Sequence, residues 1–122
     1  MSKKILIASD DSLLLDRTGG KLMTEDYEVL VARDGLDAIA GIVEHRPDMI
    51  IVDTAIPRVG GYGICALIKD NIEFGATPVV VVSDRGGLFD RARSDTLGAI
   101  RHLVKPIDDD ELVEMANRYT DA

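Results

Sequence analysis

The chain has little positive charge, a single cysteine and no long apolar segment. Its 14 lysines and arginines face 22 acids, a net charge of -8, which argues against binding nucleic acid through a basic surface. One cysteine, Cys65, allows neither a disulfide framework nor a cysteine metal cluster, so we interpret it as a small packed hydrophobe in a reducing compartment. No apolar run approaches the ~20 residues that span a bilayer, and the start does not resemble a signal peptide. We therefore expect a cytoplasmic protein without membrane insertion.

Several nucleotide and acyl-transfer motifs are also missing. The chain contains no Walker loop, no Rossmann glycine fingerprint and no serine elbow, so nucleotide or acyl chemistry has no local support. Its 122 residues are 46% hydrophobic and 30% charged, an ordinary composition for one globular domain. We therefore expect a single domain over residues 1–122.

Apolar runs alternate with helical patterns along the chain. The runs typical of strands span residues 5–8, 27–32, 48–53, 78–83 and 100–104, and an amphipathic helical pattern follows each of them. Five strands alternating with five helices predict an α/β fold, a doubly wound parallel sheet with helices on both faces. Ligand chemistry then belongs at the carboxyl ends of the strands.

Polar side chains stand where four of these strands end. They are Asp10 and Asp11 after the first strand, Asp53 after the third, Ser83 after the fourth and Lys105 after the fifth. Converging carboxylates suit a hard divalent cation such as Mg²⁺, while a lysine and a hydroxyl suit the anionic oxygens of a ligand. These groups around one nucleophilic carboxylate are the parts that phosphoryl transfer needs.

Asp53 is the centre of this hypothesis. It ends the run Met49–Val52, which is apolar on both faces and is typical of a strand buried in the middle of a parallel sheet. A carboxylate there costs several kcal/mol unless a metal or a lysine neutralises it. The plainer alternative is a turn or helix-capping aspartate.

The ordered motifs resemble the receiver domain of two-component response regulators over essentially the whole chain. The resemblance rests on residues 4–7 with the acids after them, Asp53 with Ile56-Pro57 and Gly61, residues 78–83, Gly98-Ala99 and Lys105-Pro106. It implies a stand-alone regulator with a flavodoxin-like sheet of strand order 2-1-3-4-5 and no output domain. Gly61-Tyr62, residues 65–69 and residues 87–90 are further similar to regulators of type IV pilus chemosensory systems.

The resemblance also implies roles for individual residues. Asp53 would accept a phosphoryl group from a histidine kinase, with Mg²⁺ held by Asp53, Asp10 and the backbone carbonyl of Ala55. Lys105 would contact the phosphoryl oxygens, and Ser83 would move toward them as part of the switch. The Lys105–Pro106 peptide bond is commonly cis in this family.

Four features depart from the family pattern, and the one that matters least is Gly60-Gly61, where Asp-Gly is common. Ser9 replaces the outer acid of the pair after the first strand, which would weaken Mg²⁺ binding unless Asp11 shifts to compensate. Asp84 follows Ser83, where a small residue is usual, and its charge would repel a phosphate. His102 replaces the switch aromatic: it is either an ordinary, partly exposed strand-end histidine or a polar, titrating switch residue.

The sequence leaves three hypotheses about function. The first is a phosphorylatable regulator that signals to a protein target through its fourth helix, fifth strand and fifth helix, as a monomer or a phosphorylation-linked dimer. Exposed candidates on the last two helices and the strand between them include Arg91, Arg93 and Arg101. The second is a protein-interaction module that works without phosphorylation, which Ser9, Asp84 and His102 favour. The third, a flavin or nucleotide enzyme, lacks a phosphate-cradling loop.

Overall fold

The fold is described by a computed structural model that covers residues 2–84 and 88–120. Strands and helices alternate from the first strand to the last helix, as the apolar pattern predicts. The strands are β1 (Lys4–Ala8), β2 (Glu28–Ala32), β3 (Met49–Asp53), β4 (Val79–Ser83) and β5 (Arg101–Val104). The helices are α1 (Ser12–Thr24), α2 (Gly35–His45), α3 (Gly61–Asp70), α4 (Leu88–Thr96) and α5 (Asp109–Thr120). No helix in these two ranges is both long and apolar enough to cross a bilayer.

The strands form one parallel sheet in the order β2-β1-β3-β4-β5. This order confirms the predicted doubly wound, flavodoxin-like topology. β3 lies in the middle and all five of its residues are buried. Its continuous apolar sequence follows from that place, because a central parallel strand is covered on both faces.

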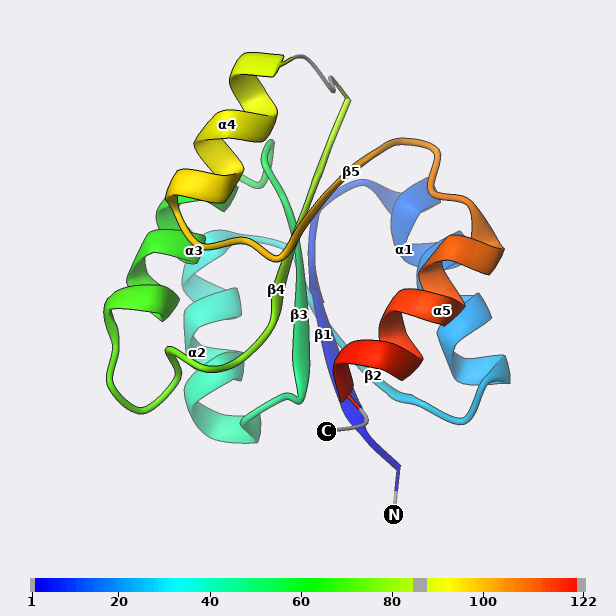
Figure 1. Ribbon diagram of the computed structural model, residues 1–122. Helices are drawn as coiled ribbons and strands as arrows, with labels where there is room; N and C mark the ends of the chain where they lie inside the picture. The colour runs from blue at the N-terminus through cyan, green and yellow to red at the C-terminus, as the bar shows by residue number, and fades with distance from the viewer. Residues whose placement is uncertain (1, 85–87, 121–122) are drawn as a thin grey trace.

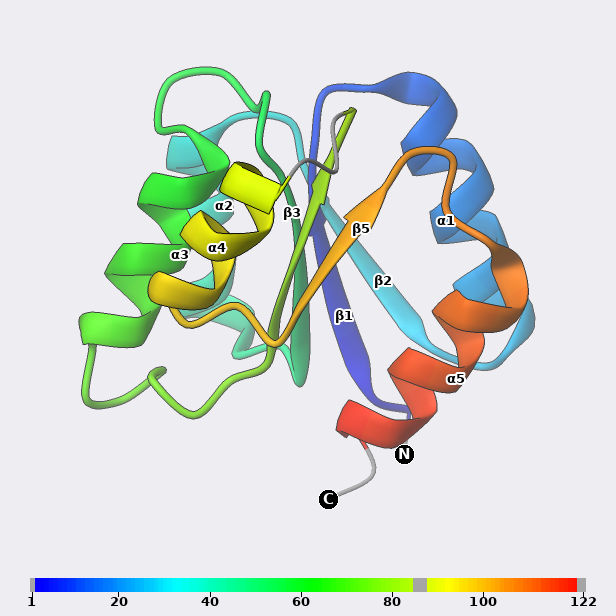
Figure 2. The same ribbon diagram turned by 45° about the horizontal axis from the view of Figure 1, so that its top comes forward.

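Helices cover both faces of the sheet. In Figures 1 and 2, α1 and α5 lie on one face, and α2, α3 and α4 lie on the other. Two separate cores result, one between the sheet and α1 with α5, the other between the sheet and the remaining helices. Because side chains alternate along a strand, each central strand supplies both cores: Ile50 and Val52 face one, Met49 and Ile51 the other.

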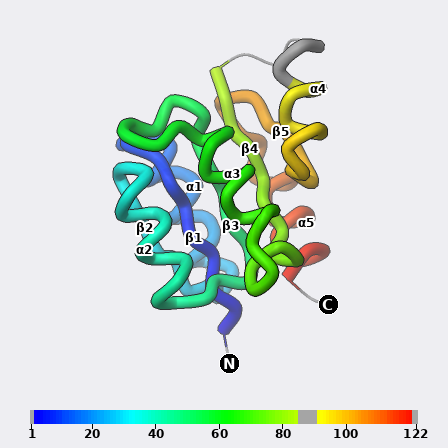
Figure 3. Tube along the Cα trace, turned by 90° about the vertical axis from the view of Figure 1, so that its left-hand side faces the viewer, coloured from blue at the N-terminus to red at the C-terminus, as the bar shows by residue number. Residues whose placement is uncertain are grey.

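All five strands point their carboxyl ends toward the same edge of the sheet, because they are parallel. β1 begins and α5 ends at the opposite end of the molecule, near one another (Figure 3). The loops after β1, β3 and β5, together with Asp84 after β4, therefore meet at the edge where the polar residues were predicted to gather. This edge holds the candidate site.

Two backbone features shape this edge. Gly61, the first residue of α3, lies so close to the end of β3 that a Cβ atom there would be 2.6 Å from the carbonyl oxygen of Asp53. The loop between β3 and α3 therefore folds tightly back onto the strand, which explains the glycine. The peptide bond between Lys105 and Pro106 is cis, as the family resemblance implies.

Candidate functional site

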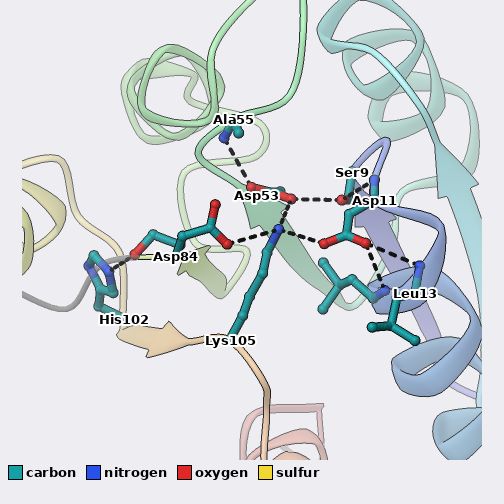
Figure 4. Close-up of polar contacts among 10 residues, drawn as sticks. Ser9, Asp11, Leu13, Asp53, Ala55, Asp84, His102 and Lys105 are labelled. Carbon is teal, nitrogen blue, oxygen red and sulfur yellow. Dashed lines mark hydrogen bonds and ion pairs between the residues drawn. The ribbon is translucent and has the colours of Figure 1, made fainter.

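Asp53 lies at the end of β3 with its side chain almost fully enclosed. It is 1% exposed. Its Oδ2 accepts hydrogen bonds from Ser9 Oγ at 2.8 Å and from Lys105 Nζ at 2.8 Å, and its Oδ1 accepts from the backbone N–H of Ala55 at 3.0 Å. Figure 4 shows these donors converging on the carboxylate from three different loops. The enclosed carboxylate thus has the cationic partner that its position requires.

Lys105, just past β5, joins three carboxylates. Besides Asp53, its Nζ lies 2.9 Å from Asp11 Oδ2 and 3.7 Å from Asp84 Oδ1 (Figure 4). Three carboxylates around one ammonium leave two negative charges in excess, so the cluster attracts further positive charge. Asp84 is the outermost acid, because its side chain is 74% exposed.

The contacts within the cluster shift the pKa values of Lys105 and Asp11. Burial opposes the charge of Lys105, but its hydrogen bonds to Asp53 and Asp11 outweigh that penalty and hold the pKa of Lys105 above its ordinary value. The hydrogen bond from Lys105, followed by that from the Leu14 backbone, lowers the pKa of Asp11. Both groups therefore stay charged at neutral pH.

The two acids after β1 differ in their placement. Asp11 is the N-cap of α1, with Oδ1 accepting from the backbone N–H groups of Leu13 and Leu14, so its Oδ2 is held toward Lys105. Asp10 is exposed, and no hydrogen bond or ion pair in the described ranges joins it to Asp53 or Lys105. The cluster thus brings Asp11, Asp53 and Lys105 together, without Asp10.

Ser9 occupies the inner position next to them. It is fully buried, donates to Asp53 and accepts the backbone N–H of Asp11 at 3.0 Å. The hydroxyl therefore links the end of β1, the start of α1 and the end of β3. It fills with a neutral group the place where the family resemblance implies an acid.

Ser83 lies at the end of β4. Within the described ranges, no hydrogen bond joins it to Asp53. Its hydroxyl lies 2.7 Å from Nε2 of His102, and Nδ1 of His102 lies 2.7 Å from the hydroxyl of Ser94 in α4. His102 is 9% exposed, so it is a buried residue and not the partly exposed strand-end histidine of the plainer interpretation. Sequence reasoning missed Ser94, because nothing in the pattern of α4 marks it.

A hollow of about 400 Å³ opens beside the cluster. Asp11, Asp84 and Lys105 line its polar side, and Leu14 and Ile107 line an apolar side between α1 and the start of α5. The candidate site is therefore reached from solvent past Lys105.

The donor set fits Mg²⁺ chemically. This ion takes one or two carboxylates and keeps several waters, and the cluster offers Asp11 and Asp53 together with an excess of negative charge. Among the described residues no three His, Cys, Asp or Glu side chains already converge as a metal site. Lys105 stands between the two carboxylates, so waters would have to supply much of the coordination.

A family model described as the response regulator receiver domain matches residues 5–117. The chain belongs to this family. The match covers β1 through most of α5, so it includes every residue of the site described above. The sequence resemblance is thereby confirmed.

Individual relatives agree with the family assignment. Protein PilG of Pseudomonas aeruginosa is 42% identical over 105 residues, which are 85% of this chain and 78% of PilG. Response regulator PleD of Caulobacter vibrioides is 36% identical over 109 residues, 89% of this chain but only 24% of PleD. The receiver domain is thus the shared part, and much of PleD has no counterpart here.

Solved structures share the fold. A putative response regulator from Chloroflexus aurantiacus superposes with a TM-score of 0.94 over 100% of both chains, at 24% identity. The receiver domain of sensor histidine kinase PA1611 from Pseudomonas aeruginosa, solved with a magnesium ion in its active-site cleft, has a TM-score of 0.90 over 100% of both chains and 22% identity. At these identities the likeness concerns the fold alone.

Proposed function

We propose that this receiver domain accepts a phosphoryl group on Asp53 from a histidine kinase, with Mg²⁺ as cofactor. The observation that carries the proposal is the enclosed Asp53 carboxylate, 2.8 Å from the ammonium of Lys105, which itself lines a solvent-open hollow. A buried carboxylate is unfavourable unless a cation neutralises it, as Lys105 does here. An acid with a purely structural role would not need a path from solvent to its cationic partner. The domain works as a phosphorylation switch rather than as an enzyme that turns over a small-molecule substrate.

The transfer conserves atoms and charge through simple substitution at phosphorus. The P–N bond of the kinase's phosphohistidine breaks, a P–O bond forms to an Asp53 oxygen, and the freed imidazole nitrogen takes up a proton. Lys105 is positioned to neutralise the phosphoryl oxygens that arrive beside Asp53. Bound Mg²⁺ would supply further charge neutralisation, held by Asp53, Asp11 or Asp10, and the carbonyl of Ala55.

The steric and electrostatic setting favours a switch over a permanent ion pair. Before transfer, Lys105 is shared by three carboxylates; after transfer, a dianionic phosphoryl group replaces the Asp53 charge and competes for the same ammonium. Asp84, which is exposed, can turn outward at little cost. Redistribution of Lys105 and Ser83 then alters β5 and the end of β4.

The response would pass to a protein target through α4, β5 and α5. A hollow of about 590 Å³ lies among these elements, with Arg91, Asp95, Arg101 and Glu111 on its walls. Such mixed charge suits a polar protein partner, and the net charge of -8 disfavours nucleic acid. We place this exchange in the cytoplasm, with the domain acting as a monomer or a phosphorylation-linked dimer.

Incubation with acetyl phosphate and Mg²⁺, followed by intact mass measurement, tests the proposal. The wild type should gain one phosphoryl group, and Asp53→Asn should gain none. Asp70→Asn, which changes an exposed carboxylate at the end of α3, is the matched control and should gain one as well. Omission of Mg²⁺ should slow the gain strongly.

A second candidate function is a protein-interaction module that has the receiver fold but is not phosphorylated. Asp53 Oδ2 already accepts from both Ser9 and Lys105, and Asp84 stands on the approach, which favours an interaction module in which Asp53 is structural. No mass gain in the wild type, together with no detectable Mg²⁺ binding, would replace the first function by this one.

A further inference from the structure

His102 forms a buried bridge between two serines that lie on different elements. Its Nε2 is 2.7 Å from the hydroxyl of Ser83 at the end of β4, and its Nδ1 is 2.7 Å from the hydroxyl of Ser94 in α4. The two serines are 5% and 1% exposed. The three side chains therefore form a continuous path from the rim of the phosphoacceptor site to α4.

The two hydrogen bonds of this path have opposite roles at the imidazole ring. A neutral imidazole has one N–H donor and one acceptor nitrogen, so one serine donates to the ring and the other accepts from it. Each hydroxyl can serve in either role, which allows both ring nitrogens to be satisfied. A phenyl or phenol ring at position 102 could not bridge two hydroxyls in this way, because it lacks a second polar atom.

The register of the sheet places this path beside Asp53. Val82 pairs with Asp53 across the β3–β4 ladder, and Ser83 is the next residue along β4. The Ser83 hydroxyl nevertheless binds His102 rather than the carboxylate cluster. A hydroxyl has a single proton, so in the tautomer in which Ser83 donates to Nε2 an anionic group on Asp53 can recruit that proton only by taking it from the bond to His102.

We propose that His102 is a positioning residue that holds the Ser83 hydroxyl in the resting state and couples it to α4 through Ser94. When Ser83 is recruited toward a phosphoryl group on Asp53, the ring loses one anchor and its bond to Ser94 weakens. Helix α4 then loosens at its buried serine. This last step rests on the proposed phosphorylation, but the coupling between Ser83 and α4 exists in the unmodified protein.

Amide hydrogen exchange of α4 in the unmodified protein tests the coupling directly. Ser83→Ala should speed exchange around Ser94 by about fivefold, which corresponds to the loss of one ordinary hydrogen bond. In a His102→Phe background the same Ser83→Ala change should have no effect on α4. An equal effect in both backgrounds, or no effect in the wild-type background, would overturn the proposal.

Two amide substitutions separate the halves of the bridge and guard against a simple packing defect. The side-chain amide of glutamine reaches the position of Nε2, and that of asparagine reaches the position of Nδ1. His102→Gln should keep the bond to Ser83 and lose the one to Ser94, while His102→Asn should do the reverse. Each variant should therefore uncouple Ser83→Ala from α4 although one serine bond survives; retained coupling in both would overturn the relay.

A final arm connects the relay to phosphorylation. After acetyl phosphate and Mg²⁺ treatment, phosphorylated wild type should show the same roughly fivefold faster exchange in α4, and phosphorylated His102→Phe should show no change. A mass gain without this difference would overturn the relay while leaving the proposed function intact. Without any mass gain the proposed function fails, and the exchange cycle in the unmodified protein still decides the relay.

Discussion

The ammonium of Lys105 and the carboxylate of Asp53 lie 2.8 Å apart, although 52 residues separate them in the chain. The Asp53 side chain is 1% exposed and that of Lys105 is 15% exposed, so water screens this pair poorly. A partly enclosed pair of this kind has an asymmetric energetic role. The intact pair adds only modestly to the free energy of unfolding, whereas removal of one partner leaves a buried charge that nothing neutralises.

Lys105→Met should therefore lower the free energy of unfolding at pH 7 by about 3 kcal/mol, because Asp53 would lose its only cationic partner among the described residues. Urea unfolding followed by circular dichroism without Mg²⁺ measures this change. Lys21→Met removes a partly exposed ion pair between Lys21 in α1 and Glu25, the C-cap of that helix, and should cost less than about 1 kcal/mol. Equal losses in the two variants would contradict the prediction.

The decrease in the free energy of unfolding at acidic pH should depend in part on Asp11. Hydrogen bonds from Lys105 and from the Leu14 backbone lower the pKa of Asp11 below its ordinary 3.8. A lowered folded-state pKa contributes stability that is present above the ordinary pKa and is lost as pH falls through the folded-state value. In metal-free Lys105→Met the pKa of Asp11 should rise toward 3.8, as a carboxyl ¹³C titration by NMR would show. An Asp11 titration identical to the wild type would refute the role given to Lys105.

Ser9 sets how strongly the cluster attracts a divalent ion. Ser9→Asp would add a carboxylate beside Asp53 and should raise Mg²⁺ affinity about tenfold, because ligand charge tunes such sites. Ser9→Ala removes the hydroxyl without adding charge and serves as the control, with no gain in affinity. Isothermal calorimetry at fixed ionic strength measures both, and unchanged affinity in Ser9→Asp would show that position 9 lies outside the ion's coordination.

The fold could be predicted because its signals are local. The apolar run Met49–Val52 marks the central strand by composition alone, and Gly and Pro residues separate the other elements. Strand order followed from the alternation of strands and helices together with the family resemblance. Tertiary packing decides only the last residue or two at each end of an element.

The site was predicted less completely, since its details depend on which way neighbouring side chains point. Ser9 turns inward at the end of β1 and Asp10 turns outward, so Asp11 becomes the acid that meets Lys105. The sequence shows three adjacent polar residues, and the family resemblance leads us to name Asp10 ahead of Asp11. The bridge from His102 to Ser94 likewise depends on how α4 packs against β5, which no short-range pattern encodes.

Cys65 should be protected from thiol reagents. Its side chain is fully buried in α3, its Sγ lies 3.3 Å from the carbonyl oxygen of Leu97, and burial raises the pKa of the thiol. Native protein should react with Ellman's reagent on the order of 10³-fold more slowly than unfolded protein. Because the folded-state pKa is raised, the thiol's contribution to stability holds below the ordinary pKa of 9.0 and declines as pH rises above it. Fast labelling at neutral pH would show that α3 opens readily.

Gly61 should be required for the placement of Asp53. A Cβ atom at Gly61 would lie 2.6 Å from the Asp53 carbonyl oxygen and 2.7 Å from the Cα of Thr54, so Gly61→Ala must displace the loop after β3. Such overpacking costs about 1–3 kcal/mol, and the displaced carboxylate should also accept a phosphoryl group more slowly.

The neighbouring glycine provides the matched control. A Cβ atom at Gly60 would meet nothing within 4 Å, and its backbone angles of -63° and 159° suit any residue. Gly60→Ala should therefore leave the free energy of unfolding and the rate of phosphorylation by acetyl phosphate close to wild type. If Gly61→Ala behaved like Gly60→Ala in both measurements, close contact between α3 and β3 would not be what holds Asp53 in place. The carboxylate would then be held by its hydrogen-bond donors, Ser9, Lys105 and the backbone N–H of Ala55.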